Sequence, residues 1–281
     1  MSLALSGSAF QVFADLLRSR SGLAIGPDKL YLLETRLAPI VRRENLRDLA
    51  SLAYRLRGPA DEALERDVVE AMTTNESFFF RDEKPFTHFR AKTLPRLLAA
   101  RPPRAPIRIW SAATAAGQEA YSLAMVVADS RARDRHVEII GTDIARDQLG
   151  RAREGLYTQF EVQRGLPIQM LLKHFRKEDS DWRITAPLRA MVQFREWNLL
   201  DDPAPLGRFD VVFCRNVLIY FDQATKGRVL DAIARQMADD GRLYLGGAET
   251  VLGVTGRFTP VAEDRGVYAK AGAEEGGSPQ P

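Results

Sequence analysis

The stretch from residue 107 to residue 125 most strongly limits what this chain can fold into. It predicts a buried strand, a turn of small residues and a helix. Ile107, Ile109 and Trp110 suit a core strand, and residues 112–117 have small side chains. In a doubly wound sheet, such a strand-turn-helix unit lies at the carboxyl edge of the strands, where ligands bind. The stretch therefore predicts an α/β domain with a ligand site at that edge.

The turn itself lacks the usual signs of phosphate binding. Gly117 is its single glycine, and the chain contains neither G-x-G-x-x-G nor G-x-x-x-x-G-K-[ST]. A tightly packed turn without a ligand explains residues 112–117 equally well if they are taken alone.

Composition bounds the class of protein. A chain of 281 residues with 45% hydrophobic and 27% charged residues fits one α/β domain plus a smaller helical one. The net charge of +3 gives no indication of nucleic-acid binding. Cys214 is the single cysteine, so the sequence predicts neither a disulfide nor a metal site. We find no signal-peptide pattern and no apolar window of bilayer length, so we expect a cytoplasmic protein without direct membrane insertion.

Changes in the spacing of apolar residues along the sequence indicate where one domain ends and the next begins. Apolar residues recur at helical spacing in four stretches between residues 10 and 72, which predicts a four-helix bundle. The expected organisation is a helical bundle (1–74), a motif segment with a helix and a Pro-rich linker (75–106), an α/β domain (107–271) with an inserted β-subdomain (156–191), and a disordered tail (272–281).

The bundle has a basic stretch. Between Lys29 and Arg57 there are seven basic residues and three acidic ones. This face could meet an acidic partner, but a solvated helix surface is the more common explanation of such a run.

Polar residues follow several predicted strands of the α/β domain. Asp143 ends the second strand, where an acid can accept two hydrogen bonds from a ribose diol. Residues 112–119, Asn198 and residues 215–220 follow other strands and should converge on the same crevice. Because the phosphate-binding patterns are absent, this site favours a nucleoside whose tail carries no phosphate, such as S-adenosylmethionine, over a dinucleotide or ATP.

Five segments, in matching order, resemble the chemotaxis receptor methyltransferases of the CheR type. They are residues 74–81 (Thr-Asn-Glu-Ser-Phe-Phe-Phe-Arg), 110–112 with 117–122, 142–144, 198–200 and 213–221. The resemblance runs through about Lys270. It implies an all-α N-terminal domain before a Rossmann-like S-adenosylmethionine-dependent methyltransferase sheet with a small inserted β-subdomain. It also implies a protein-glutamate O-methyltransferase that acts on the cytoplasmic helical domain of methyl-accepting chemoreceptors and releases S-adenosylhomocysteine.

The resemblance also implies roles for individual residues. The cofactor pocket would comprise Asn75, Ser77 and Arg81 at the methionine end, Glu119 at the amino group, Asp143 at the ribose, Asn198 and Leu199 at the adenine, and Arg215 and Asn216 closing it. Tyr220 would lie beside Arg81 near the transferred methyl group, and these two residues are the expected catalytic pair. A receptor glutamate has a reference pKa near 4.3, so it is already an anionic nucleophile and needs no general base.

Two departures from the family pattern carry expectations of their own. Ala113 to Ala116 read Ala-Thr-Ala-Ala where the family usually has a Gly-Cys-Ser/Thr type of turn, so the backbone approach to the ligand could differ. In members that dock a receptor's C-terminal pentapeptide, the β-subdomain carries a glycine-containing loop. Residues 176–181 contain no glycine, so we expect no pentapeptide tethering.

Three other functions stay open. A nucleic-acid methyltransferase would share the fold, but it would need an Asn/Asp-Pro-Pro-aromatic motif, and residues 215–218 contain no proline. A non-catalytic module could keep the cofactor pocket for regulation. A methyltransferase of this family could also act on a protein that is not a receptor. We expect the protein to be a monomer.

Overall fold

The structure, a computed structural model, describes residues 7–132 and 134–272 and separates into two compact units. The first unit runs to Thr74 and also takes in Tyr220–Thr225, and the second comprises Asn75–Ile219 and the chain from Lys226 onward. Within the described ranges, no helix is long and apolar enough to cross a membrane. The predicted tail from residue 273 lies outside the described residues.

The first unit is the predicted four-helix bundle. Its helices are α1 (Gly7–Ser21), α2 (Leu30–Arg43), α3 (Leu49–Leu56) and α4 (Glu62–Met72). Asp48 and Asp61 cap the N-termini of α3 and α4 by accepting hydrogen bonds from the amides of Ser51 and Leu64. The predicted apolar stripes meet in a core, in which Phe13 and Leu37 are completely buried.

Much of the basic stretch is paired inside this unit. Arg36 donates hydrogen bonds to the carbonyls of Met72 and Thr73, 2.7 and 2.8 Å away. Arg43 forms ion pairs with Glu44 and Asp67, and Arg55 forms ion pairs with Glu44 and Asp61. These contacts use a large part of the predicted basic face to hold the bundle together.

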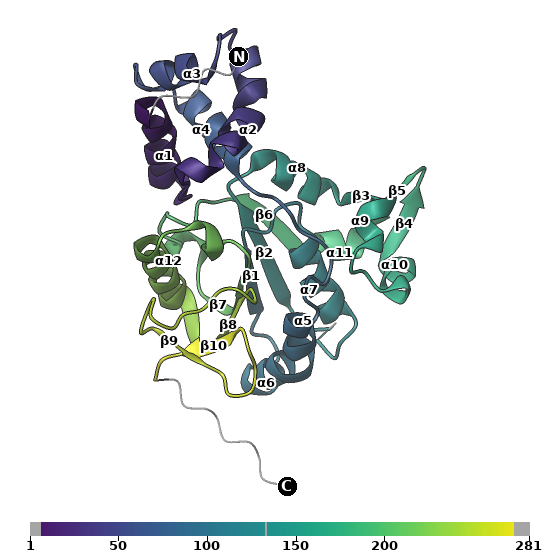
Figure 1. The fold of residues 1–281 in the computed structure, drawn as a ribbon. Helices are drawn as coiled ribbons and strands as arrows, with labels where there is room; N and C mark the ends of the chain where they lie inside the picture. Colours follow the sequence, from purple (N-terminus) through teal and green to yellow (C-terminus); the bar gives the residue numbers. More distant parts are fainter. Residues whose placement is uncertain (1–6, 133, 273–281) are drawn as a thin grey trace. The chain divides into compact units, whose positions relative to one another are not determined.

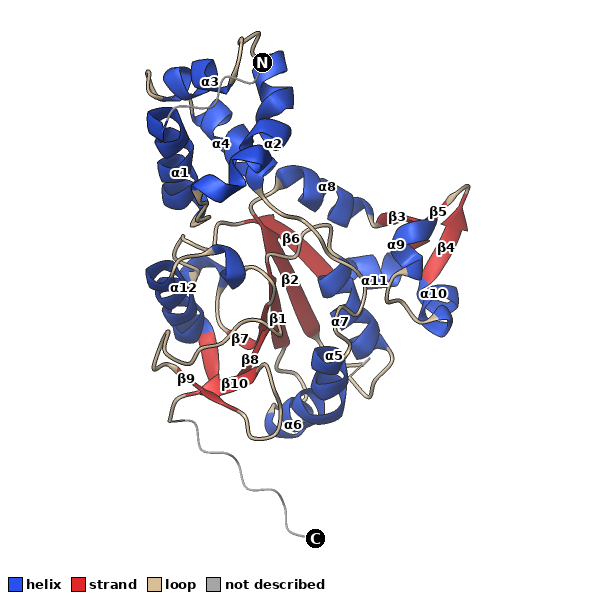
Figure 2. Ribbon diagram, viewed as in Figure 1, coloured by secondary structure: helices blue, strands red, loops and turns tan. Residues whose placement is uncertain are grey.

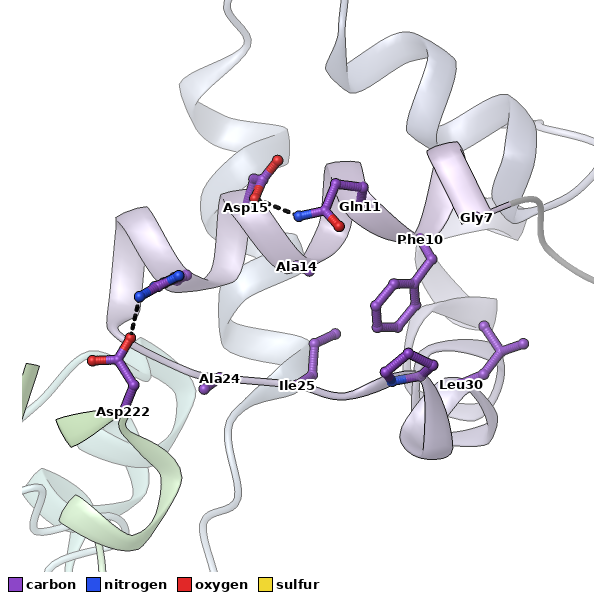
Figure 3. A pocket seen from close by; sticks show the side chains of 11 residues that line it. Gly7, Phe10, Gln11, Ala14, Asp15, Ala24, Ile25, Leu30 and Asp222 are labelled. Atoms are coloured by element: carbon purple, nitrogen blue, oxygen red, sulfur yellow. Dashed lines mark hydrogen bonds and ion pairs between the residues drawn. The ribbon is translucent and has the colours of Figure 1, made fainter. Parts of the chain in front are cut away.

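The first unit also contains an open cavity of about 570 Å³. Figure 3 shows it between α1 and the chain around Ile25, with the ring of Phe10 on one side and the ion pair of Arg18 and Asp222 on the other. The residues that the sequence predicts for the functional site do not line this cavity.

The second unit is built on a seven-stranded sheet (Figure 1, Figure 2). Its strands, in chain order, are β1 (Ile107–Ala112), β2 (Val137–Asp143), β6 (Val192–Glu196), β7 (Phe209–Cys214), β8 (Met237–Leu245), β9 (Phe258–Pro260) and β10 (Val267–Lys270). The spatial order is β6-β2-β1-β7-β8-β10-β9. The first five strands are parallel, and β10 and β9 add an antiparallel end. The predicted Rossmann-like sheet is therefore confirmed.

Burial explains why the central elements are so apolar. Every residue of β7 is buried, as expected for a strand covered on both faces. The helix α7 (Gln118–Ala128) is buried around most of its circumference, which requires neighbours on all sides. Figure 1 shows α7 and α12 (Gln223–Gln236) on opposite sides of the sheet.

Two boundaries differ from those that the sequence predicts. The sequence predicts a single helix over residues 85–98 of the segment 75–106. The structure has α5 (Lys84–His88), a π-helical turn (Phe89–Thr93) and α6 (Leu94–Ala100) there. Pro95 lacks an amide hydrogen and clashes with the preceding turn, which accounts for the widened turn before it. The apolar spacing of Val229, Ile233 and Met237 predicts a helix that Gly241 ends, but α12 stops at Gln236 and β8 begins at Met237. Met237 is buried, so the apolar spacing simply continued across the boundary.

The inserted subdomain holds a three-stranded sheet of order β3-β5-β4. Its elements are β3 (Leu156–Thr158), α9 (Gln159–Gln163), α10 (Ile168–His174), β4 (Phe175–Glu178), β5 (Asp181–Ile184) and α11 (Ala186–Ala190). The prediction of a charged loop over residues 176–181 is wrong. These residues form a β-hairpin, in which Glu178 of β4 pairs with Asp181 of β5. Exposed charges on an edge strand hide the alternation that normally marks a strand.

Gly165 offers a sharp test of the subdomain's packing. A Cβ at this position would lie 2.1 Å from the carbonyl oxygen of Phe79, and its φ of +82° disfavours side chains. We expect Gly165→Ala to lower the free energy of unfolding by at least about 2 kcal/mol. Gly150→Ala, in an exposed helical position with open space around it, should instead raise it by about 1 kcal/mol. Urea denaturation of both variants measures this, and equal stabilities would contradict the packing.

Candidate functional site

The carboxyl ends of the parallel strands bring distant segments together. Ala112 at the end of β1 is in register with Thr142 of β2 and Cys214 of β7, so the residues that follow these strands share one edge. Asp143 is in register with Glu196 of β6, which leads to Asn198. This is the edge that the sequence predicts for the ligand site.

The turn after β1 is strained at its alanines. Ala113 and Ala115 have φ values of 57° and 49°, and Gly117 has a φ of 88°. This left-handed region suits glycine and costs an alanine roughly 1–2 kcal/mol. The turn therefore keeps a backbone path typical of glycine even though two alanines occupy it.

Asp143 holds that turn in place. Its two carboxylate oxygens accept hydrogen bonds from the amides of Ala115 at 2.8 Å and Ala145 at 2.9 Å. Burial raises the pKa of the Asp143 carboxyl, and the two amides oppose that rise. Each oxygen keeps a further lone pair, so the carboxylate can still accept hydrogen bonds from a ligand.

Glu119, in the first turn of α7, lies against Arg215. One of its carboxylate oxygens accepts a hydrogen bond from the Ser111 hydroxyl at 2.8 Å, and the other is 3.0 Å from the Arg215 guanidinium. Burial raises the pKa of the Glu119 carboxyl, whereas Arg215 and Ser111 oppose the rise. The side chain of Glu119 remains 12% exposed, so a cation could still reach it.

The guanidinium of Arg215 connects this acid to the segment of residues 76–82. Arg215 donates to the Arg81 carbonyl at 2.8 Å and pairs with Asp82 at 2.7 Å. Its side chain is only 1% exposed, so it is one of the most deeply buried charges of the unit. Three predicted site residues, Arg81, Glu119 and Arg215, are therefore joined directly.

Glu249 is a residue of this edge that sequence reasoning missed. Its carboxylate accepts hydrogen bonds from four amides, those of Asn216, Val217, Leu218 and Gly246, at 2.7–2.9 Å. It thereby holds the predicted site residue Asn216 at a φ of 59°. One signal was available, because Glu249 follows Gly246 and Gly247 just after the parallel strand β8.

The remaining predicted site residues are less buried than Asp143 and Arg215. Asn75 and Ser77 are half-buried on the extended chain that opens the second unit. Asn198 and Leu199 are half-buried after β6, and the Asn198 side chain accepts a hydrogen bond from the Leu200 amide at 3.0 Å. Tyr220 groups with the first unit, where its carbonyl accepts a hydrogen bond from the Ala24 amide at 2.9 Å. Its proximity to Arg81 thus stays a prediction.

Metal-ligating residues do not gather in the described ranges. No group of three or more His, Cys, Asp or Glu side chains there could hold a metal ion. His88 contacts Tyr244 and Asp264, and His174 contacts Asp129.

The parallel sheet, its small-residue turn and its acidic edge define a class once they are compared with known families. Residues 75–267 match the family described as "CheR methyltransferase, SAM binding domain". The second unit is thus the catalytic domain of an S-adenosylmethionine-dependent methyltransferase. Residues 8–73 match "CheR methyltransferase, all-alpha domain".

Individual relatives agree with that class. The chain is 36% identical to the "Chemotaxis protein methyltransferase" of Vibrio parahaemolyticus, over 95% of this chain and 98% of that protein. It is 35% identical to "Chemotaxis protein methyltransferase 1" of Pseudomonas aeruginosa, over 93% and 97% of the two chains. The chain belongs to the CheR methyltransferase family. A solved structure of magnesium protoporphyrin IX methyltransferase from Synechocystis covers 70% of this chain and 65% of its own, at 16% identity and a TM-score of 0.35, a likeness too weak to argue from.

The site fits S-adenosylmethionine, the cofactor of this family. The cofactor carries an ammonium group and a sulfonium, both cationic, and the edge offers two acids, the buried Asp143 and the partly exposed Glu119. Two buried polar atoms, Nε of Arg215 and Oε1 of Gln118, have no hydrogen-bond partner among the described residues. Such atoms are what a polar ligand satisfies when it binds.

The strained turn yields a stability test. We expect Ala113→Gly to raise the free energy of unfolding by up to about 1 kcal/mol, because glycine relieves the left-handed strain at a half-buried position. The control Ala116→Gly changes a buried alanine of the same turn without positive φ, and it should lower stability by about 1–2 kcal/mol. Thermal denaturation of the two variants measures these changes. If both variants were destabilised alike, Ala113 would not be strained.

Glu249 yields a second test. Glu249→Gln replaces one acceptor oxygen by a donor and leaves buried amides without a partner, so we expect a loss of about 2–4 kcal/mol in unfolding free energy. Glu263→Gln, at an exposed site of the same unit, should change stability by less than about 0.5 kcal/mol. Chemical denaturation of both variants measures the difference, and a Glu249→Gln protein as stable as the control would show that the four bonds contribute little.

Proposed function

We propose that this chain transfers the methyl group of S-adenosylmethionine to glutamate side chains on the cytoplasmic helical domain of chemoreceptors. The products are glutamate methyl esters and S-adenosylhomocysteine, and the enzyme works in the cytoplasm as a monomer. The observation that carries the proposal is the hydrogen-bonded path from Glu119 through Arg215 to Arg81. It joins the acid suited to the cofactor to the arginine suited to the acceptor.

The cofactor's place follows from the acids of the edge. Bound S-adenosylmethionine would supply a methyl group on a sulfonium. The group that leaves is the neutral thioether of S-adenosylhomocysteine, which needs no proton. Glu119 pairs with the ammonium group and Asp143 accepts hydrogen bonds from the ribose hydroxyls. The predicted pocket is completed by Asn75 and Ser77 at the methionine end, Asn198 and Leu199 at the adenine, and Arg215 and Asn216 closing it.

The acceptor needs orientation rather than activation. A glutamate carboxylate is anionic at neutral pH, so the reaction requires no general base. Arg81 aligns this carboxylate for in-line attack, with Tyr220 near the transferred methyl group. Positioning of two reactants can supply roughly 7–11 kcal/mol of barrier lowering.

We further propose that the receptor is recognised without a pentapeptide tether. The hairpin between β4 and β5 turns through only Asp179 and Ser180, and its exposed edge strand carries Arg176, Lys177 and Glu178. A short, charged edge of this kind disfavours the addition of a peptide strand.

The raised pKa of Glu119 predicts a pH dependence of cofactor binding. Below that pKa the carboxyl is protonated and no longer attracts an ammonium group, so affinity falls as pH decreases through it. Because burial raises the pKa, the fall should begin above the usual range of a glutamate. Calorimetric titration with S-adenosylmethionine between pH 5 and 8 should show it. In Glu119→Gln, affinity should be lower and its pH dependence weaker; an unchanged profile would exclude the role.

Radiolabel transfer tests the proposed function itself. The purified chain is incubated with methyl-labelled S-adenosylmethionine and membranes that contain chemoreceptors. We expect label on the receptor that base releases as methanol, the signature of a carboxyl ester. Cofactor binding without transfer would indicate a non-catalytic module, and label on another protein or on nucleic acid would indicate a different acceptor.

A truncated receptor tests the absence of tethering. Deleting the last five residues of the receptor should leave the initial rate of methylation unchanged. A peptide of those five residues should give no heat of binding in calorimetry. A rate that falls severalfold on deletion would overturn this part of the proposal.

A further inference from the structure

An arginine of the inserted subdomain lies next to the arginine proposed to align the acceptor. The guanidinium carbons of Arg164 and Arg81 lie over the ring of Phe78, at 4.3 and 5.5 Å from its centroid. Both side chains can reach solvent, since Arg164 is 44% exposed and Arg81 is half-buried. Two cations thus flank one aromatic ring at an accessible surface.

A carboxylate of the chain itself, that of Glu76, forms an ion pair with Arg164, and Arg81 contacts the backbone of the same residue. Glu76 accepts a hydrogen bond from Arg164 at 2.6 Å, and its backbone carbonyl accepts one from Arg81 at 2.8 Å. The hydrogen bond and charge of Arg164, with a contribution from Arg81, hold the pKa of the Glu76 carboxyl below its usual range. Because Glu76 is 57% exposed, its ion pair with Arg164 contributes little free energy, and its carboxylate can separate into water at small cost.

The backbone around this cluster is fixed. Gly165 lies so close to the Phe79 carbonyl that it tolerates no side chain, and Phe79 is completely buried against Tyr157 and Phe175. On the other side, the Arg81 carbonyl accepts a hydrogen bond from Arg215. A rigid backbone therefore presents two partly exposed arginine side chains and one exposed carboxylate.

We propose that Arg164 is a substrate-binding residue that, together with Arg81, holds the carboxylate of the acceptor side chain, and that Glu76 occupies this place between turnovers. The inference rests on the proposed function, because it takes the acceptor to be a carboxylate. The incoming carboxylate exchanges with that of Glu76, so Arg164 keeps a counter-ion throughout. Arg164 selects a carboxylate over the isosteric carboxamide, which is neutral.

The proposal predicts opposite kinetic effects for the two members of the ion pair. Arg164 binds the acceptor alike before and during transfer, so its loss should raise KM for the receptor and leave kcat unchanged. Loss of the Glu76 charge removes a competitor, so it should lower KM. A half-exposed charge pair corresponds to an effect of about 5-fold in each direction.

The experiment uses the full chain and a purified receptor cytoplasmic fragment with one methyl-accepting glutamate. Arg164→Ala should raise KM about 5-fold, Glu76→Gln should lower it, and both should bind S-adenosylmethionine as the wild type does. Arg176→Ala removes the same charge from the same subdomain and should change nothing. A receptor fragment with glutamine at the acceptor position should inhibit the wild type with an inhibition constant above the KM for the glutamate fragment. This preference for the carboxylate should be smaller in Arg164→Ala.

The outcomes separate this inference from the proposed function. If the wild type binds the cofactor but labels no receptor glutamate, the proposed function fails and the inference fails with it. If the wild type is active while Arg164→Ala has the wild-type KM, only the inference is overturned. A higher KM in Glu76→Gln would also overturn it, since Glu76 would then assist the substrate rather than compete with it.

Discussion

The second unit depends on the buried guanidinium of Arg215. This cation lies between Glu119 on α7 and Asp82 on the chain that precedes α5, and it also donates to the carbonyl of Arg81. A buried charge is tolerated only where partners compensate it, and Arg215 has two carboxylates and a carbonyl. The parallel sheet supplies the frame, because β7 delivers Arg215 to the same edge as the turn after β1. Three segments that lie far apart in the chain are therefore held in one arrangement around a single ion.

Carboxylates organise the backbone of this edge. Asp143 fixes the strained turn after β1, and Glu249 fixes the turn after β7 through four amides. Both turns contain residues at positive φ, which are costly unless their surroundings determine them. The same acids give the edge a negative character that suits a cationic cofactor. Residues that fix the backbone of this edge, such as Asp143, are also proposed to bind the ligand. This is typical of sites that are rigid before the ligand binds.

The inserted subdomain contributes Arg164 to the cluster around Phe78, where we propose that the acceptor binds. Arg164 reaches the segment of residues 76–82 from a turn that Gly165 allows to pass close to the Phe79 carbonyl. In the arrangement that we propose, the cofactor half of the site comes from the strand edge, and the acceptor half comes from the segment after the helical bundle together with the insertion. The two proposed halves lie on separate stretches of sequence.

Sequence patterns determined the elements and the class. The apolar spacing gave the four helices and the parallel strands, and the turn of small residues marked the edge, because side-chain period and size are local properties. The C-terminal end of α12 was missed because an apolar spacing continues across it. The hairpin at residues 176–181 was missed because exposed charges mask the alternation of a strand. Glu249 and Arg164 were not foreseen either. Their partners lie 33 and 88 positions away, at Asn216 and Glu76, and only the folded chain brings such residues into contact.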